Sequence, residues 1–142
     1  MGLNQYEAVM KAASDPTRIR ILKILEGGEI CVCQIIAVIQ LSQPTISNHL
    51  SLLKSAGLIT DRKDKKWVFY SLDGQDADGY AGRTLRNLRD LLNDDPLIER
   101  DRERTALARK LGPVTICALG MTLPRGKAAC CAPAPSGGIG SA

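Results

Sequence analysis

The chain has 142 residues and a net charge of +4 at pH 7, which fits one domain with some excess length. Hydrophobic residues make up 44% and aromatic residues only 4%, so the core must be mostly aliphatic, which favours helices. No apolar run approaches the roughly 20 residues that span a bilayer, and the N-terminus lacks a signal-peptide pattern. We therefore expect a cytoplasmic protein with no membrane partner and with reduced thiols.

Two helices are predicted in the first 27 residues. The first carries Leu3, Tyr6 and Met10 at helical spacing. The second begins at Ser14-Asp15-Pro16, because Asp15 can accept hydrogen bonds from the free N–H groups of the first turn and proline fits the first helical position. Gly27-Gly28 ends this helix.

The next segment predicts a helix-turn-helix. A third helix begins near Cys31 or Val32 and ends near Gln40. Leu41-Ser42 forms the turn and caps a fourth helix, which Gly57 ends. Two helices joined by so short a turn are typical of a helix-turn-helix.

The following residues predict a β-hairpin and further helices. Residues 58–63 and 66–72 read as two strands around a turn at Asp64-Lys65, which makes the fold mainly α with a small β-hairpin wing. We expect residues 1–95 to form a winged helix-turn-helix domain for DNA binding and dimerisation, with a fifth helix over residues 81–92. Residues 96–111 predict a charged C-terminal helix, and residues 112–142, rich in Pro, Gly and Ala, a flexible cysteine-containing tail.

The fourth helix and the hairpin have the composition of a DNA-binding surface. Polar side chains in the N-terminal half of a recognition helix read base edges, and basic side chains on a wing contact phosphate or the minor groove. A packing role is the alternative for His49, and a solvated hairpin tip is the alternative for the wing. The predicted contacts are Gln43, Thr45, Ser47, Asn48, His49, Arg62, Lys63, Lys65 and Lys66.

Five cysteines at odd spacing are candidate ligands or sensors. Soft thiolates select thiophilic ions, and Cys31 and Cys33 lie just before the recognition helix. On a regular helix their side chains would point about 200° apart. We therefore expect the first turn of the third helix to distort or unwind when both bind one ion, which would oppose DNA binding. The alternative is that both are small buried hydrophobic residues.

Five blocks of the sequence, within about residues 5–95, resemble the ArsR/SmtB repressors, and most closely their arsenic-sensing branch. They lie in residues 15–22, 29–33, 41–50, 53–59 and 62–70. The most specific motifs among them are Asp15-Pro16-Thr17-Arg18, Cys31-Val32-Cys33 and Gln43-Pro44-Thr45-Ile46-Ser47-Asn48-His49-Leu50.

The resemblance implies a metal-responsive transcriptional repressor that leaves its operator when the metal binds. Carried over, Cys31 and Cys33 would bind trivalent arsenic or antimony, so that arsenite or antimonite is the inducer, with no catalytic cofactor. The branch often has a third cysteine where this chain has Ile36. The third ligand is then open: a small exogenous thiol, none at all, or one of Cys117, Cys130 and Cys131.

We expect a homodimer that reads an inverted repeat in double-stranded operator DNA. The apolar stripes of the first and fifth helices are the expected dimer surface; the alternative is that they only close the monomer core.

Other functions for the same residues remain as alternatives. A thiol redox repressor would oxidise Cys31 and Cys33, although their spacing strains an internal disulfide. Cadmium or lead could be the sensed metal, and the tail cysteines could belong to a metal carrier. The single histidine argues against the zinc branch's imidazole sites. An enzyme is not expected, because there is no CxxC motif, no catalytic constellation around His49 and no phosphate-binding glycine loop.

Overall fold

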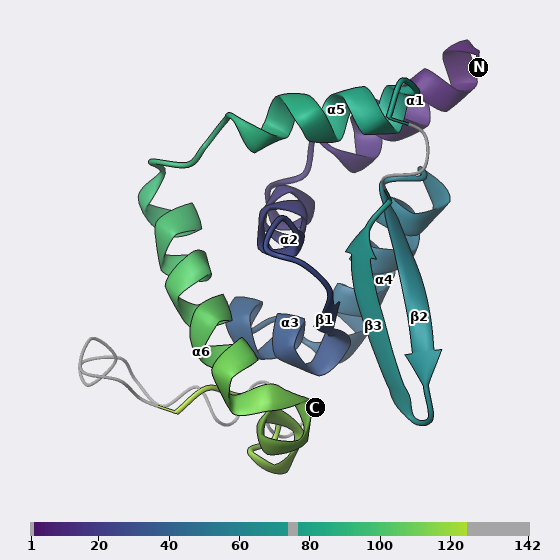
Figure 1. The fold of residues 1–142 in the computed structure, drawn as a ribbon. Helices are drawn as coiled ribbons and strands as arrows, with labels where there is room; N and C mark the ends of the chain where they lie inside the picture. The colour runs from purple at the N-terminus through teal and green to yellow at the C-terminus, as the bar shows by residue number, and fades with distance from the viewer. Residues whose placement is uncertain (1, 74–76, 125–142) are drawn as a thin grey trace.

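The computed structural model describes residues 2–73 and 77–124. It confirms a mainly α fold with a small β-hairpin wing (Figure 1). The elements in chain order are α1 Leu3–Ala12, α2 Pro16–Leu25, β1 Ile30–Cys31, α3 Val32–Ile39, α4 Gln43–Ser55, β2 Ile59–Asp64, β3 Trp67–Leu72, α5 Tyr80–Arg89 and α6 Pro96–Ala118.

The predicted helix-turn-helix is formed by α3 and α4. Gln40 ends α3 in a left-handed backbone conformation, with φ 66°, which turns the chain toward α4. The hydroxyl of Ser42 then caps α4 by accepting a hydrogen bond from the Thr45 N–H at 3.4 Å. Ile46 and Leu50 on the inner face of α4 are buried, so the opposite face points outward.

The wing is part of a three-stranded antiparallel sheet in the order β1-β3-β2. Strands β2 and β3 form the predicted hairpin, with Lys65 in a left-handed conformation at its turn. Strand β1 is not predicted by the sequence, because two residues are too few to show the alternation that identifies a strand. Ile30 pairs with Tyr70 and Cys31 with Phe69, so β1 joins the wing to the start of α3.

Helices α1 and α5 pack against each other at the edge of the molecule away from α3 (Figure 1). Tyr6 and Tyr80 make an edge-to-face contact between them, with ring centroids 5.2 Å apart. Within the part of the chain that the structure describes, α5 has no buried residue. Its apolar stripe, which includes Leu85 and Leu88, is half-buried. The fifth helix is confirmed, and its stripe is only partly covered by the rest of the chain.

The charged C-terminal helix packs onto the body of the domain. α6 begins after Asp95, whose carboxylate accepts hydrogen bonds from two N–H groups of the first turn, and it contacts α2 and α3. Ile98 and Ala108 are buried there, and Asp101 forms a bidentate pair with Arg20 of α2 at 2.7 and 2.9 Å. This helix therefore contributes to the same core as the predicted winged-helix domain.

The expected start of the flexible tail at Gly112 is wrong. Gly112 interrupts α6 with a backbone of φ 82° and ψ 161°, but the helix resumes at Pro113 and continues to Ala118. Ile116 in this last segment is buried, so apolar packing holds the segment against the domain after the break. The remainder of the predicted tail, residues 125–142, lies outside the described residues.

Within residues 2–73 and 77–124, none of the helices combines the length and the apolar character that a bilayer crossing requires.

Candidate metal centre and nucleic-acid interface

Cys31 and Cys33 lie together at the junction of β1 and α3. Cys31 is the residue that precedes the helix and has an extended backbone, with φ −74° and ψ 147°. The sulfur of Cys33 lies 3.1 Å from the sulfur of Cys31. Only 1% of Cys31 and 4% of Cys33 is exposed. The two thiols therefore form a buried pair at the N-terminus of α3.

The predicted divergence of the two cysteine side chains is wrong. That expectation placed both residues on a regular helix, where a separation of two residues turns the side chain by about 200°. Cys31 instead belongs to β1, and its extended backbone turns its side chain toward Cys33. Because the pair is already converged, chelation requires no unwinding of α3.

The two thiols have opposite protonation behaviour. The pKa of Cys31 is lowered to about 6, chiefly by the hydrogen bond from Cys33, with the backbone N–H groups of Cys33, Val68 and Val32 adding to it and burial opposing it. The pKa of Cys33 is raised by the same hydrogen bond, by burial and by the negative charge of Cys31. At neutral pH the pair is thus one thiolate and one thiol, and the thiolate is the form that binds metals.

The surroundings of the pair come from α3 and α6. The side-chain oxygen of Gln34 accepts a hydrogen bond from the Cys31 N–H at 3.0 Å, and its amide nitrogen donates to the Ala108 carbonyl at 2.8 Å. The Pro113 carbonyl lies 3.8 Å from the Cys33 sulfur. Ile36, which stands where the resemblance suggested a third cysteine, is fully buried in the core.

The structure does not assemble a third ligand beside the pair. Among the residues it describes, no group of three or more His, Cys, Asp or Glu side chains is arranged to hold a metal ion. Cys117 is exposed on the last segment of α6. Cys130 and Cys131 lie outside the described residues. The described residues therefore bring together two sulfur atoms at this point of the fold.

The outer face of α4 presents most of the predicted DNA contacts. Gln43, Thr45, Ser47 and Asn48 are exposed. His49 differs, because only 15% of its side chain is exposed. Its Nδ1 lies 3.3 Å from the guanidinium of Arg18, in the first turn of α2, and 3.9 Å from the carboxylate of Asp15, which precedes that helix. His49 thus contacts the start of α2, while the other four side chains lie on the exposed face. The Thr45 hydroxyl there lies 2.7 Å from the Ser42 hydroxyl, within hydrogen-bond distance.

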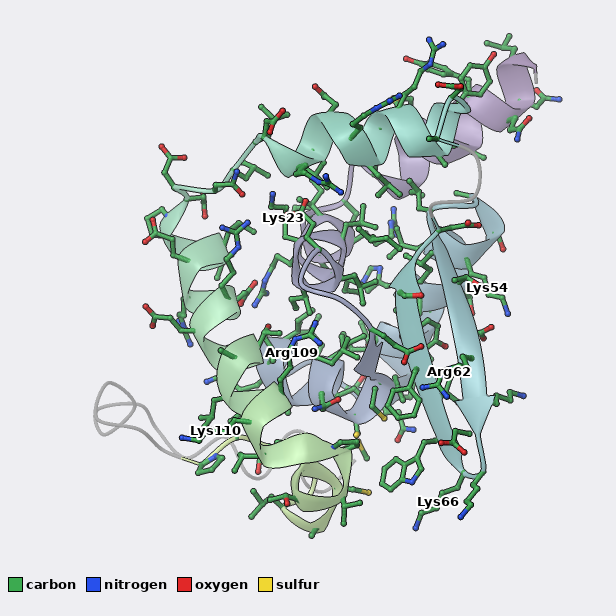
Figure 2. The ribbon with its side chains drawn as sticks, in the orientation of Figure 1. Lys23, Lys54, Arg62, Lys66, Arg109 and Lys110 are labelled. Carbon is green, nitrogen blue, oxygen red and sulfur yellow. The ribbon has the colours of Figure 1, made fainter. Side chains whose placement is uncertain are left out.

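The predicted basic residues of the wing differ in their surroundings, since one is held in an ion pair and the others are exposed (Figure 2). Arg62 forms a bidentate ion pair with Glu29 at 2.7 and 3.0 Å, and its guanidinium lies 4.7 Å from the centre of the Phe69 ring. Lys63, Lys65 and Lys66 are exposed toward the hairpin tip. Figure 2 shows the Lys66 side chain at that tip, directed away from the domain. The lysines are therefore better placed than Arg62 to contact phosphate.

Sequence reasoning missed the residues that connect the two candidate sites. Glu29 precedes β1 and holds Arg62 of the wing, and the Val68 N–H of β3 contributes to the lowered pKa of Cys31. The only sequence signal for these contacts is an acidic residue just before the cysteines and a basic residue in the hairpin. Charges of opposite sign so far apart in sequence do not by themselves indicate a pair.

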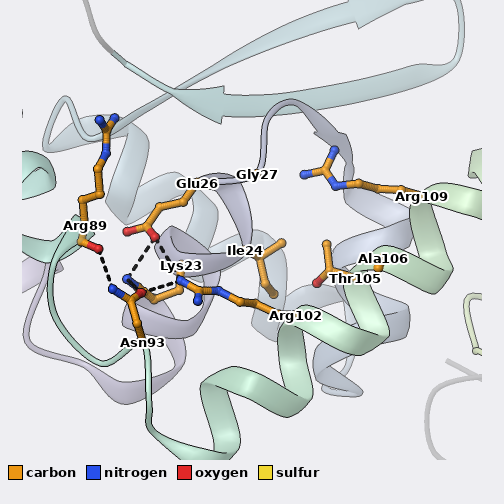
Figure 3. Close-up of a pocket in the computed structure, with 10 residues that line it drawn as sticks. All are labelled: Lys23, Ile24, Glu26, Gly27, Arg89, Asn93, Arg102, Thr105, Ala106 and Arg109. Carbon is orange, nitrogen blue, oxygen red and sulfur yellow. Dashed lines mark hydrogen bonds and ion pairs between the residues drawn. The ribbon is translucent and has the colours of Figure 1, made fainter.

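A separate basic cavity lies between α2 and α6 (Figure 3). It has a volume of about 540 Å³, and the junction of α5 and α6 closes one side of it. Lys23, only 2% exposed, donates to the carbonyls of Leu88 and Leu91 and pairs with Glu26 at 2.9 Å. Arg109 donates to the carbonyls of residues 28 and 29. Two of the cavity's positive charges thus hold the fold together. Lys23 joins α2 to the end of α5 and the residues after it, and Arg109 joins α6 to the loop before β1.

Comparison with known proteins finds regulators of transcription that are similar to this chain. Residues 15–61 match the family model "Bacterial regulatory protein, arsR family". An uncharacterized HTH-type transcriptional regulator from Methanocaldococcus jannaschii is 52% identical over 72 residues, which cover 48% of this chain and 81% of that protein. An arsenical resistance operon repressor from Staphylococcus xylosus is 36% identical over 85 residues, 60% of this chain and 81% of that protein.

A shorter match is found with a cadmium resistance regulatory protein CadC homolog from Staphylococcus aureus. It is 47% identical over 68 residues, which cover 47% of this chain and 56% of that protein. The chain therefore spans little more than half of this relative.

Solved structures agree with the fold. HlyU from Vibrio cholerae superposes with a TM-score of 0.55 at 29% identity, covering 65% of this chain and 98% of that one. The homodimeric winged helix-turn-helix DNA-binding domain Mb0332 from Mycobacterium bovis superposes with a TM-score of 0.54 at 30% identity, covering 61% of this chain and 77% of that one. These neighbours thus support a winged helix-turn-helix fold for this chain.

Proposed function

This chain belongs to the arsR family of bacterial regulatory proteins, and from that premise we propose that it is a repressor whose operator complex dissociates when trivalent arsenic or antimony binds Cys31 and Cys33. Its relatives and structural neighbours are transcriptional regulators, which confirms the prediction that it is not an enzyme.

The observation that carries the proposal is the distance of 3.1 Å between the two sulfurs. Metal–sulfur bonds of about 2.3 Å separate two sulfurs by about 3.8 Å at a tetrahedral centre, and by about 3.3 Å where the bonds meet near a right angle, as at a pyramidal centre. The pair fits a pyramidal ion with little rearrangement. Sulfur donors without an imidazole or carboxylate in the group favour a soft ion.

The DNA contacts follow from the exposed face of α4 and the wing. We assign base contacts to Gln43, Thr45, Ser47 and Asn48, whose amides and hydroxyls can hydrogen-bond base edges in the major groove. Phosphate contacts come from Lys63, Lys65 and Lys66. The half-buried His49 acts through its contact with Arg18, by holding α4 against α2.

A homodimer would present two such surfaces to an inverted repeat. Its interface is the half-buried apolar stripe of α5 together with α1, where Leu3 and Tyr6 are exposed in the single chain. The homodimeric state of a structural neighbour supports this part of the proposal.

The coupling between ligand and DNA runs through β1. Cys31 pairs with Phe69 of the wing strand, and the Val68 N–H contributes to the lowered pKa of the Cys31 thiolate. A sulfur atom that forms a bond to a metal shares its charge, so its hydrogen bonds from Cys33 and Val68 weaken. The wing and the start of α3 then shift together. By linkage, operator DNA and inducer weaken each other's binding, typically by about 1–3 kcal/mol.

The test is a titration of arsenite into a complex of the protein with its own promoter DNA. The wild type is expected to dissociate, whereas the Cys31→Ser/Cys33→Ser double variant should bind the same DNA and remain bound. Cys130→Ser/Cys131→Ser is the matched control, since it also removes two thiols, and it should dissociate like the wild type. Release of the Cys31→Ser/Cys33→Ser variant by arsenite would disprove the proposal.

A second candidate keeps the operator and changes the signal. The close sulfur pair would also suit oxidation, and the cadmium-related homologue makes cadmium a competing inducer. Peroxide and cadmium arms in the same titration separate these candidates. Dissociation by peroxide under anaerobic, arsenite-free conditions would favour a redox signal, and dissociation at lower cadmium than arsenite would favour a cadmium signal.

A further inference from the structure

The cavity between α2 and α6 has the size and the charge of a site for a small anion (Figure 3). Its volume of about 540 Å³ lies within the range of small-molecule pockets, roughly 300–1,000 Å³. Four basic side chains and one acidic side chain line it, which gives a net charge of +3. Charges in a partly enclosed site are screened less than charges in open water. The cavity therefore favours a ligand with negative charge.

One face of α6 supplies two of the basic side chains and the surface between them. At the spacing i, i+3, i+4 and i+7, which keeps side chains on one face of a helix, this face consists of Arg102, Thr105, Ala106 and Arg109. The two arginines lie about two helical turns apart, and Figure 3 shows both side chains extending from α6 toward α2. Thr105 and Ala106 between them are small. This face suits a ligand with two anionic groups on a short carbon chain.

Both arginines keep hydrogen-bond donors for a ligand. A guanidinium carries a fork of N–H donors, more than a single pair of acceptors can use. Arg109 donates to two backbone carbonyls before β1, and Arg102 donates to the Asn93 amide oxygen and lies 3.5 Å from Glu26. Burial lowers the pKa of Arg109, so an anion beside it would stabilise its charge. The remaining N–H groups can bind carboxylate oxygens, which match the geometry of a guanidinium.

The wall of the cavity also contains a buried acceptor that lacks a donor. Glu26 Oε1 pairs with Lys23 at 2.9 Å. Within residues 2–73 and 77–124, Glu26 Oε2 is the one buried side-chain nitrogen or oxygen atom without a hydrogen-bond partner. Lys23 has no donor left for it, because its ammonium group already donates to two backbone carbonyls and to the Asn93 amide oxygen. Buried polar atoms nearly always have a partner, so a ligand here should carry a hydroxyl or an ammonium group.

We propose that this cavity binds a small dicarboxylate that also carries a hydroxyl or ammonium group, with its carboxylates on Arg102 and Arg109 and its donor on Glu26 Oε2. The inference goes beyond the function proposed above, since no residue described as lining the cavity is a cysteine. A ligand held in this way joins α2 to α6. Because it binds the folded chain and not the unfolded one, it stabilises the protein as its concentration rises.

The test is calorimetric titration and thermal unfolding of the full-length protein with malate, which has two carboxylates and a hydroxyl, and with succinate, which lacks only the hydroxyl. We expect malate to bind and to raise the unfolding temperature, and succinate to bind at least about tenfold more weakly. Arg102→Gln should weaken malate binding at least about tenfold. Arg100→Gln is the matched control, because it removes one charge from an exposed position of α6 outside the cavity, and it should bind malate like the wild type.

Glu26→Gln tests the unpaired oxygen by itself. Its amide keeps an acceptor for Lys23 and places an N–H group where Oε2 lies, so the variant should lose the preference for malate over succinate. Equal binding of the two acids by the wild type would overturn the proposal and show that water alone meets Oε2. No binding of malate, or equal binding by the wild type and Arg102→Gln, would overturn it as well. Cys31→Ser/Cys33→Ser should bind malate like the wild type, so the result is independent of any response to arsenite.

Discussion

Cys31 stands opposite Phe69 in the antiparallel pair of β1 and β3, so the first of the two proposed sulfur ligands is also a residue of the wing sheet. The Phe69 ring lies beneath the Arg62 guanidinium, and Arg62 pairs with Glu29, two residues before Cys31. The region of the cysteine pair and the wing are therefore joined by backbone pairing, one ion pair and one ring contact. A displacement at the sulfur pair acts on the wing without first passing through the recognition helix.

The salt dependence of operator binding should identify the lysines that touch phosphate. Each phosphate contact adds about one to the slope of log affinity against log salt. We expect Lys65→Gln/Lys66→Gln to reduce the slope by about four in the proposed homodimer, because each of its two wings loses two lysines. Lys110→Gln is the matched control, because Lys110 is exposed on α6, on the side away from the wing (Figure 2). Anisotropy of labelled operator at several salt concentrations measures the slope, and equal slopes in both variants would contradict the assignment.

Arg62→Gln should change that slope less than loss of either lysine. Glu29 already neutralises Arg62, and their ion pair raises the pKa of Arg62 while it lowers the pKa of Glu29. We expect the variant instead to weaken the response of DNA binding to arsenite, because it removes a link between β1 and the wing. The same anisotropy assay with and without arsenite checks this. A slope change as large as that of a lysine variant would place Arg62 on the phosphates.

The free energy of unfolding should depend on pH through the sulfur pair. The folded pair loses one proton near pH 6 and keeps the other above 9, the pKa of an unperturbed thiol here. The unfolded chain therefore binds one more proton between pH 6 and 9. The free energy of unfolding should rise with pH in that window, by up to about 1.4 kcal/mol per pH unit, and fall above it.

Urea unfolding between pH 6 and 10 measures this dependence, with Cys31→Ser/Cys33→Ser as the reference. The difference in unfolding free energy between wild type and variant should grow from pH 6 to 9 and then decline. A difference that stays constant over this range would show that the pair does not share a proton as described.

Gly112→Ala should destabilise the protein, because Gly112 has a left-handed backbone conformation inside α6. The substituted Cβ meets no atom within 4 Å, so the cost comes only from the backbone conformation, and we expect about 1–3 kcal/mol. Lys110→Ala, two residues earlier at an exposed helical position, should change stability by less than about 0.5 kcal/mol. Thermal unfolding checks both variants. Equal stability of the two would mean that α6 can run straight through residue 112.

Lys23→Met should destabilise the fold by about 3 kcal/mol, because it leaves Glu26 without its buried partner and removes the hydrogen bonds from Lys23 to the Leu88 and Leu91 carbonyls. The control is Lys11→Met, which removes an exposed pair with Glu7 at 3.9 Å and should cost less than about 0.5 kcal/mol. Urea unfolding compares them. A small effect at Lys23 would indicate that the methyl end of methionine packs where the ammonium group lies.

The sequence predicted the helices because their boundaries carry local signals. Asp15-Pro16, Ser42 and Gly57 act on neighbouring backbone groups, and the structure places them at helix ends as expected. The position of Cys31 could not be predicted in this way. Whether that residue begins a helix or ends a strand depends on Phe69, 38 positions later, with which it pairs.

The sequence predicts the cysteines of the candidate site but not the contacts that connect them to the rest of the fold. Cys31 and Cys33 were identified from spacing and resemblance, and the structure brings them together. The break at Gly112 followed from composition, but the helix after it did not, because burial of Ile116 in the domain is what stabilises that segment. Contacts such as Glu29 with Arg62 join residues distant in sequence, and only the fold reveals them.

Gln34 sets a condition on moving this sensor into another protein. Its side-chain oxygen accepts a hydrogen bond from the Cys31 N–H, and its side-chain nitrogen donates one to the Ala108 carbonyl. One side chain therefore joins the junction of β1 and α3 to α6. A glutamate there would set an acceptor against the Ala108 carbonyl, and a leucine would satisfy neither group. Transplanting the two cysteines alone would thus leave the backbone that carries them without these two hydrogen bonds. A working graft needs a glutamine at the position of Gln34 and a neighbouring helix with a backbone carbonyl within hydrogen-bond distance of its amide.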